Sequence, residues 1–444
     1  MADGYRSADR DRGARLILAE AGTAAVSIGV QERFTTAFAI FLGASTMQVG
    51  ILSAVSHLLL AVSQLSSARL IGVLGGRKRM LVAAALMSAV PFLFLALIPV
   101  IPSDARVWAL ILLGSFAFAL TYLGLPAWGS LVADLVPVGR RGRFLGLRSS
   151  ILTGVGLTVG LSGAFLLDGL GEKVMWGFVS VFAVAVVAGV VSAVILSRVV
   201  DPNPELTIDA GDSPWKQMTN LGKTTLGRYN GLNLAFHISI GISAPFMAVY
   251  LLRELDVSYS WFVGMGVVSS LTAIAANSLW GRLVDFKGTS LVLAISATLI
   301  GLHPLLFLAS GEMWYLFLIF GIIGVTSAGW GISSYNFVLE NSDKEKRPAA
   351  VGTFNAVASA GMFAGALIGS AIAAHVPTLF SNQLLTLFLL SSMLRLVTVA
   401  WLMPGVMGVG GLTGIANSLL HGGAVRATVL RQRFVSFVHA ILHV

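Results

Sequence analysis

The chain has 444 residues, of which 56% are hydrophobic and only 11% are charged, and its mean hydropathy is +0.86. A soluble domain carries about 25% charged residues. This composition therefore excludes a soluble globular protein, and the apolar runs predict an all-α polytopic membrane protein because a spanning helix needs about 20 residues. The absence of cysteine excludes disulfides and cysteine-ligated metals.

Twelve apolar runs follow one another along the chain, each long enough to cross a bilayer. They predict membrane-spanning helices at residues 17–43, 47–67, 80–100, 107–135, 144–168, 174–197, 229–252, 259–280, 289–309, 313–338, 349–375 and 382–403.

The positive charges predict the orientation of these spans. The net charge is +9, and nearly all Lys and Arg residues fall in the termini and in alternate loops that share one side; only Arg106, Lys173 and Arg253 fall in loops on the other. Because basic loops stay in the cytoplasm, we expect both termini there. We also expect a bacterial-type inner (cytoplasmic) membrane as the location. Since the basic residues are explained by this topology, we expect no nucleic-acid partner. Residues 1–15 are followed by no small-residue cleavage site, so the first span should act as its own signal anchor.

The chain divides into two similar halves. Residues 198–228 are polar and contain three prolines, which predicts a cytoplasmic linker between six-helix bundles at 16–197 and 229–404, with a tail at 405–444. Arg69, Leu70 and Gly75 are matched by Arg282, Leu283 and Gly288 at one constant offset, and Asp134, Arg141 and Gly146 by Glu340, Arg347 and Gly352 at another. This pattern predicts two parallel six-helix repeats.

These features resemble the major facilitator superfamily of secondary transporters, whose hallmark between spans two and three is Gly-x-x-x-Asp-x-x-Gly followed by basic residues. The second half keeps Gly281, Asp285 and Gly288; the first half keeps only Gly75, Arg77 and Lys78, with Ala68 and Gly72 in place of the first Gly and the Asp. The resemblance covers residues 16–404. It implies alternating access, a central cavity lined by spans one, four, seven and ten, a small-molecule substrate and a monomeric unit without cofactor.

Charged residues at the loop ends form a candidate cytoplasmic gate. We predict the ion pairs Arg69–Asp134 and Arg282–Glu340, one in each half, which would break when that side opens. The alternative is that all four side chains face headgroups and water, where ion pairs contribute little. The complete candidate gate set is Arg69, Asp134, Arg141, Arg282, Asp285, Glu340 and Arg347.

Three polar residues, Gln31, Glu32 and Arg33, interrupt the first apolar run. A charge at the bilayer centre costs about 2.5–3.5 kcal/mol on insertion scales, so these residues are expected to face a polar cavity or a partner helix. A carboxyl group removed from water binds a proton more readily, which makes Glu32 the candidate proton carrier. A nearby Arg33 opposes this, so coupling requires a contact that is made and broken; a purely structural ion pair is the alternative.

Other polar and aromatic side chains on the central spans are candidates for substrate contact or, equally, for ordinary packing. They are His57, Tyr122, Trp128, Asn233, His237, Trp330, Tyr335 and Asn336. Arg395 and His303, on spans that are peripheral in the family, are expected to be structural.

Several other functions are disfavoured. The segment around Lys223 lacks the first glycine of a phosphate-binding loop, and no metal-binding histidine pair or nucleophile elbow occurs, so we expect neither an enzyme nor a metal site. The sequence features together predict a proton-coupled transporter, with an uncoupled facilitator or a non-transporting receptor as alternatives. The apolar tail at 427–444 predicts an interfacial helix on the bilayer surface.

Overall fold

The computed structural model describes residues 2–202, 224–342 and 347–407, and within these ranges every regular element is helical. The predicted linker lies mostly, and the predicted interfacial helix entirely, outside the described residues. The first half contains α1 (Ala2–Phe41), α2 (Thr46–Leu74), α3 (Arg77–Ala96), α4 (Ser103–Leu123), α5 (Leu125–Leu135), α6 (Val138–Gly169) and α7 (Val174–Ser197). The second half contains α9 (Thr225–Gly241), α10 (Phe246–Val249), α11 (Tyr259–Lys287), α12 (Thr289–Leu306), α13 (Met313–Glu340), α14 (Arg347–Ile372) and α15 (Gln383–Met407).

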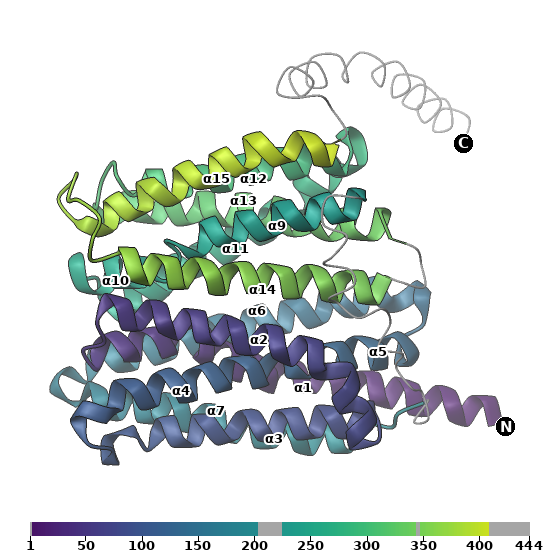
Figure 1. The fold of residues 1–444 in the computed structure, drawn as a ribbon. Helices are drawn as coiled ribbons and strands as arrows, with labels where there is room; N and C mark the ends of the chain where they lie inside the picture. Colours follow the sequence, from purple (N-terminus) through teal and green to yellow (C-terminus); the bar gives the residue numbers. More distant parts are fainter. Residues whose placement is uncertain (1, 203–223, 343–346, 408–444) are drawn as a thin grey trace, which may run out of the picture.

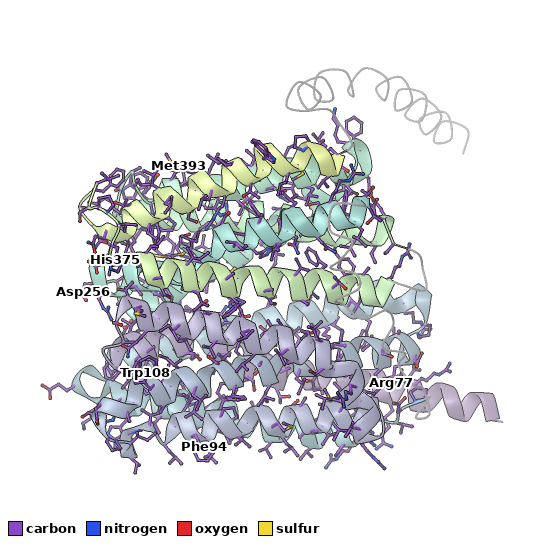
Figure 2. The ribbon with its side chains drawn as sticks, in the orientation of Figure 1. Arg77, Phe94, Trp108, Asp256, His375 and Met393 are labelled. Carbon is purple, nitrogen blue, oxygen red and sulfur yellow. The ribbon has the colours of Figure 1, made fainter. Side chains whose placement is uncertain are left out.

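Twelve of the described segments are long and apolar enough to cross a membrane, which confirms the predicted spans. The helices lie roughly parallel in two stacked bundles, and α1 begins at the same end of the molecule at which α15 stops (Figure 1). We call this the termini end and the opposite one the far end. Apolar side chains such as Phe94, Trp108 and Met393 are exposed on the outside (Figure 2), as expected for a surface in contact with lipid.

Two predicted spans are broken, and α1 is longer than predicted. Span four changes from α4 to α5 at Gly124, just before Pro126, and span seven leaves the helix after Gly241, just before Pro245. Proline has no N–H to donate and its ring clashes with the preceding turn, so it breaks a helix interior. The helix α1 begins at Ala2 rather than near residue 17, so the predicted N-terminal tail is helical.

The apolar core has three parts. One cluster contains residues of both halves, such as Phe34 and Phe178 from the first and Phe246 and Phe388 from the second. The other two clusters each belong to a single half, one around Leu131 and one around Phe337. Among the described residues, the two halves therefore share one core cluster, and each half also has a cluster of its own.

Close contacts between the halves show that this shared region is the far end. A Cβ atom added to Gly50 of α2 would overlap Ser370 of α14. The backbone of α2 therefore packs directly against a side chain of α14 at this point. The carboxylate of Asp168, at the end of α6, accepts hydrogen bonds from the backbone N–H groups of Tyr259 and Ser260 at 2.9 and 2.8 Å. An acceptor from one half thus caps the first turn of α11 in the other.

Candidate functional site

The polar centre of the first half is a hydrogen bond between α1 and α4. The hydroxyl of Tyr122 donates to the Glu32 carboxylate at 2.6 Å, a length typical of a charge-assisted bond. Glu32 is exposed although it lies within an apolar span. The first half meets the second through α6, which touches α11, and α2, which touches α14. The helices that carry Glu32 and Tyr122, α1 and α4, pack against α6 and α2 respectively.

The neighbours of Glu32 point elsewhere, as expected for consecutive helix positions. Gln31 is buried and donates to the carbonyl oxygen of Gly114 at 3.1 Å. Arg33 lies against α6, where a Cβ on Gly160 would come within 2.7 Å of the arginine Cδ. The small residues of α6 thus make room for Arg33 and for close packing with α1.

A row of neighbouring aromatic and histidine rings runs from Tyr122 in the first half to Trp330 in the second. The Tyr122 ring packs edge-on to Phe118 at 5.3 Å between centroids, and Phe118 lies 5.4 Å from the ring of His57 on α2. His57 lies near enough to His237 on α9 for an electrostatic interaction. The ring of His237 is in turn 6.2 Å from Trp330 on α13. Sequence reasoning missed Phe118, which carries no polar signal.

The other residues predicted to contact substrate lie outside this row of rings. Asn233 is fully buried and its amide donates to the Phe354 carbonyl of α14 at 3.0 Å. Trp128 stacks under the Arg148 guanidinium, 3.9 Å from the ring centroid. Tyr335 is exposed and Asn336 half-buried, one to two turns beyond Trp330 along α13.

The structure gives Asp134 a different partner from the predicted Arg69. Asp134 pairs with Arg77, the first residue of α3, at 2.7 Å, and Arg77 also binds Asp201 at 2.5 Å and the Ser130 hydroxyl at 2.9 Å. Arg77 is only 1% exposed, whereas Arg69 is exposed. The sequence pointed to Arg69 because a loop pattern does not show which side chain turns inward.

The second predicted pair, Arg282–Glu340, is not formed among the described residues either. Glu340 instead accepts a hydrogen bond from the hydroxyl of Thr289, the first residue of α12, at 2.6 Å. Arg282 and Asp285 are both exposed on α11. Arg347 donates to the Leu339 carbonyl at 3.3 Å, and the Arg141 side chain lies outside the described residues.

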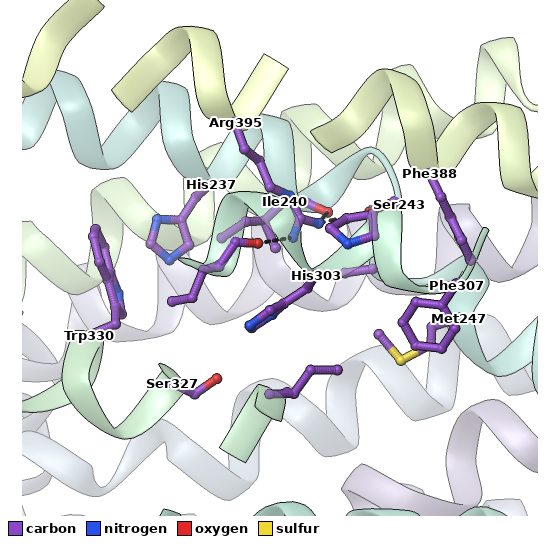
Figure 3. A pocket seen from close by; sticks show the side chains of 14 residues that line it. His237, Ile240, Ser243, Met247, His303, Phe307, Ser327, Trp330, Phe388 and Arg395 are labelled. Carbon is purple, nitrogen blue, oxygen red and sulfur yellow. Dashed lines mark hydrogen bonds between the residues drawn. The ribbon is translucent and has the colours of Figure 1, made fainter. Parts of the chain in front are cut away.

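A cavity of about 250 Å³ lies inside the second half, between α9, α12, α13 and α15 (Figure 3). Its polar lining includes His237, His303 and Arg395, together with Ser243 and Ser327. His303 and Arg395 were predicted to be peripheral anchors, yet both line the same cavity as His237. The sequence feature that could have indicated this site is the presence of a charged or polar residue within an apolar span.

Among the described residues, no three His, Cys, Asp or Glu side chains gather closely enough to hold a metal ion.

Twelve spans in two bundles around a polar centre define the class of molecule, which is the transporter fold of the major facilitator type. The Major Facilitator Superfamily model matches residues 21–229 and again 230–412. The chain belongs to that family. No curated protein sequence matches the chain.

Three solved structures with a similar fold are titled as transporters. A point mutant of the nucleoside transporter NupG has a TM-score of 0.69 at 14% identity, covering 88% of this chain and 99% of that one. An inward-facing, unoccupied bacterial homologue of the human lysosomal transporter Spinster has a TM-score of 0.61 at 15% identity, covering 90% and 96%. A POT family transporter in complex with a thioalcohol conjugated peptide reaches 0.63 at 12% identity, covering 87% and 94%. At these identities the likeness concerns the fold alone.

Proposed function

We propose that this protein is a proton-coupled secondary transporter that moves a small solute across a bacterial-type inner membrane by alternating access. The observation that carries the proposal is Glu32, an exposed carboxylate inside an apolar span that accepts a hydrogen bond from Tyr122 of the neighbouring helix. A buried structural ion pair does not require such exposure. A group that must contact a solute and a proton in turn does require exposure.

The division of the core supports alternating access. The halves share apolar packing at the far end and have separate cores elsewhere. If the termini end is cytoplasmic, as the basic loops indicate, this arrangement is the inward-facing state. Rocking the halves about the centre would separate Asp168 from Tyr259 and bring the termini ends together.

The coupling step is proposed to occur at Glu32. An ionised carboxylate accepts the Tyr122 hydroxyl strongly, and protonation weakens that charge-assisted bond. Loss of the charge would also lower the cost of placing Glu32 in a closed, dry centre. A solute that binds beside His237 would then return through the closed state together with the proton.

The termini-end charges are proposed to tune the balance of states. Arg77 fastens α3 to α5 and to the segment after α7, all within the first half. It allows this half to move as a rigid body. The exposed Arg69 of the first half and the exposed Arg282 and Asp285 of the second are available for contacts between the halves when the termini end closes. Among the described residues, no ion pair joins the two halves.

A ligand-stabilisation screen tests the proposal. The purified protein and its Glu32→Gln variant are heated with sugars, amino acids, organic acids, lipophilic cations, nucleosides and short peptides at two pH values. A ligand that binds the folded state raises the melting temperature by mass action. We expect one compound class to stabilise both proteins, with a stabilisation that depends on pH in the wild type and loses that dependence in the variant.

Other outcomes distinguish the alternatives. Stabilisation that is independent of pH in both proteins, followed by pH-independent flux in liposomes, would indicate an uncoupled facilitator. Stabilisation without any flux would indicate a receptor that has kept the transporter fold.

A further inference from the structure

The cavity of the second half contains an arginine without an acidic partner. Arg395 on α15 is 5% exposed, and among the described residues no carboxylate lies within ion-pair distance of it. None of the residues that line the cavity is acidic. A buried charge is costly unless it is paired, so this side chain needs a source of negative charge.

The protein supplies only part of that charge. The Arg395 guanidinium donates to the carbonyl oxygens of Ile300 and Ile240 at 3.2 and 3.4 Å and to the Ser243 hydroxyl at 2.8 Å (Figure 3). Ile240 lies in the last turn of α9, and a helix C-terminus carries about half a negative charge. Guanidinium has five N–H groups. The buried Nε has no acceptor among the described residues.

Within the described part of the chain, both histidines of the cavity keep one ring nitrogen uncommitted. The Nδ1 of His237 contacts the Asn233 carbonyl at 2.9 Å and therefore carries the proton. The Nε2 of His303 contacts the Thr326 hydroxyl at 2.6 Å, and that hydroxyl already donates to the Ile322 carbonyl. His303 is thus the donor in that contact. The remaining nitrogen of each ring can meet a ligand, and each becomes a donor when the ring is protonated.

Most of the remaining lining residues are apolar. In Figure 3, Met247, Phe307 and Phe388 gather on the right of the cavity, and Trp330 stands at the opposite end beyond His237. Ser327 on α13 lines the cavity and is exposed. The lining combines one cation, two histidines and an apolar wall, which matches a small organic molecule with an anionic group at one end.

We propose that this cavity binds a small amphipathic organic anion, with Arg395 pairing with its carboxylate or equivalent group. The inference deepens the proposed function by naming the substrate class, and it rests on that function only in taking the bound anion to be the transported solute. A cavity of about 250 Å³ lies just below the usual 300–1,000 Å³ of ligand pockets, so the anion is a small one.

Benzoate and its uncharged isostere benzamide are suitable probes for a thermal-shift measurement in detergent at constant ionic strength. We expect benzoate to raise the melting temperature of the wild type and benzamide to leave it unchanged. Arg395→Gln should abolish the benzoate shift, and Arg395→Lys should keep part of it. Equal shifts with both probes would overturn the proposal, because recognition would then not depend on charge.

A plug variant keeps the test valid if Arg395→Gln does not fold. Ser327→Trp places a large side chain in the cavity lining at a residue other than the hydrogen-bond partners of Arg395 named above. Leu318→Trp on the outer face of α13 is its matched control, since Leu318 is 51% exposed. We expect Ser327→Trp to remove the benzoate shift and Leu318→Trp to retain it. A full shift in Ser327→Trp, or a shift removed by Arg33→Gln but not by Arg395→Gln, would refute this location.

The Glu32→Gln variant separates the two proposals. It should bind benzoate like the wild type, because Glu32 does not line the cavity. Failure of benzoate to bind either protein contradicts the anion site alone, whereas binding without flux in liposomes contradicts only the transport function.

Discussion

The two halves place the same contact at the termini end and give it different chemistry. In the first half the acid at the end of span four, Asp134, meets the first residue of α3, Arg77. In the second half the acid at the end of span ten, Glu340, meets the first residue of α12, Thr289. The repeat therefore preserves where the helices touch while the interaction changes from a buried ion cluster to a single hydrogen bond.

The difference has an energetic meaning. Arg77 is buried and binds two carboxylates and a serine, so each of these groups depends on it. The Glu340 carboxylate is exposed and is solvated by water whether or not Thr289 binds it. We infer that the termini end of the first half is held more firmly than that of the second.

The largest effect is expected for Arg77→Gln. The change removes the guanidinium that pairs with Asp134 and with the nearly buried Asp201, and breaking a buried pair in this way costs about 3–5 kcal/mol. The loss should appear as a lower free energy of unfolding in mixed detergent micelles, followed by circular dichroism. An effect below about 1 kcal/mol would mean that water replaces the arginine.

A smaller and graded effect is expected when either acid is neutralised. Asp201→Asn should cost more than Asp134→Asn, because the Asp201 side chain is 6% exposed and that of Asp134 is 28% exposed. A charge-assisted hydrogen bond contributes about 1.5–3 kcal/mol, which is the range expected for Asp201. The same unfolding assay measures both variants, and the reverse order would contradict the role given to burial.

The matching change in the second half should matter less. Thr289→Val removes the hydroxyl that binds Glu340 and keeps the side-chain shape, and a single hydrogen bond is worth about 0.5–1.5 kcal/mol. Thr289→Ser retains the hydroxyl and serves as the control. A loss as large as that of Arg77→Gln would show that the two halves are equally dependent on this contact.

The smallest effects are expected at the arginines first predicted to form the gate. Arg69→Gln and Arg282→Gln change exposed side chains, and such substitutions usually alter stability by less than about 0.5 kcal/mol. If these residues act only in the closed state, they should alter transport rate without altering stability. A destabilisation above about 2 kcal/mol would mean that they have buried partners in the resting state.

The fold was largely predictable and the site only in part. Long apolar runs must become helices in a bilayer, so all twelve spans and the two halves were predicted, and Glu32 stood out as a charge within a span. The breaks before Pro126 and Pro245 were not predicted, although proline offered a signal. The partners of Asp134 and Glu340 were missed because helix rotation decides which side chain faces inward. Arg395 was expected to be a structural anchor, and it does donate to the backbone and a serine of neighbouring helices; the cavity that it lines was not predicted.

The most direct test of the central claim compares two transport modes in liposomes that contain wild type or Glu32→Gln, with a radiolabelled ligand found by the stabilisation screen. Counterflow exchange needs only alternating access, whereas uptake driven by an imposed pH gradient also needs the proton site. We predict that the variant keeps exchange and loses most gradient-driven uptake. Gradient-driven uptake equal to that of the wild type would contradict the role of Glu32 in proton coupling.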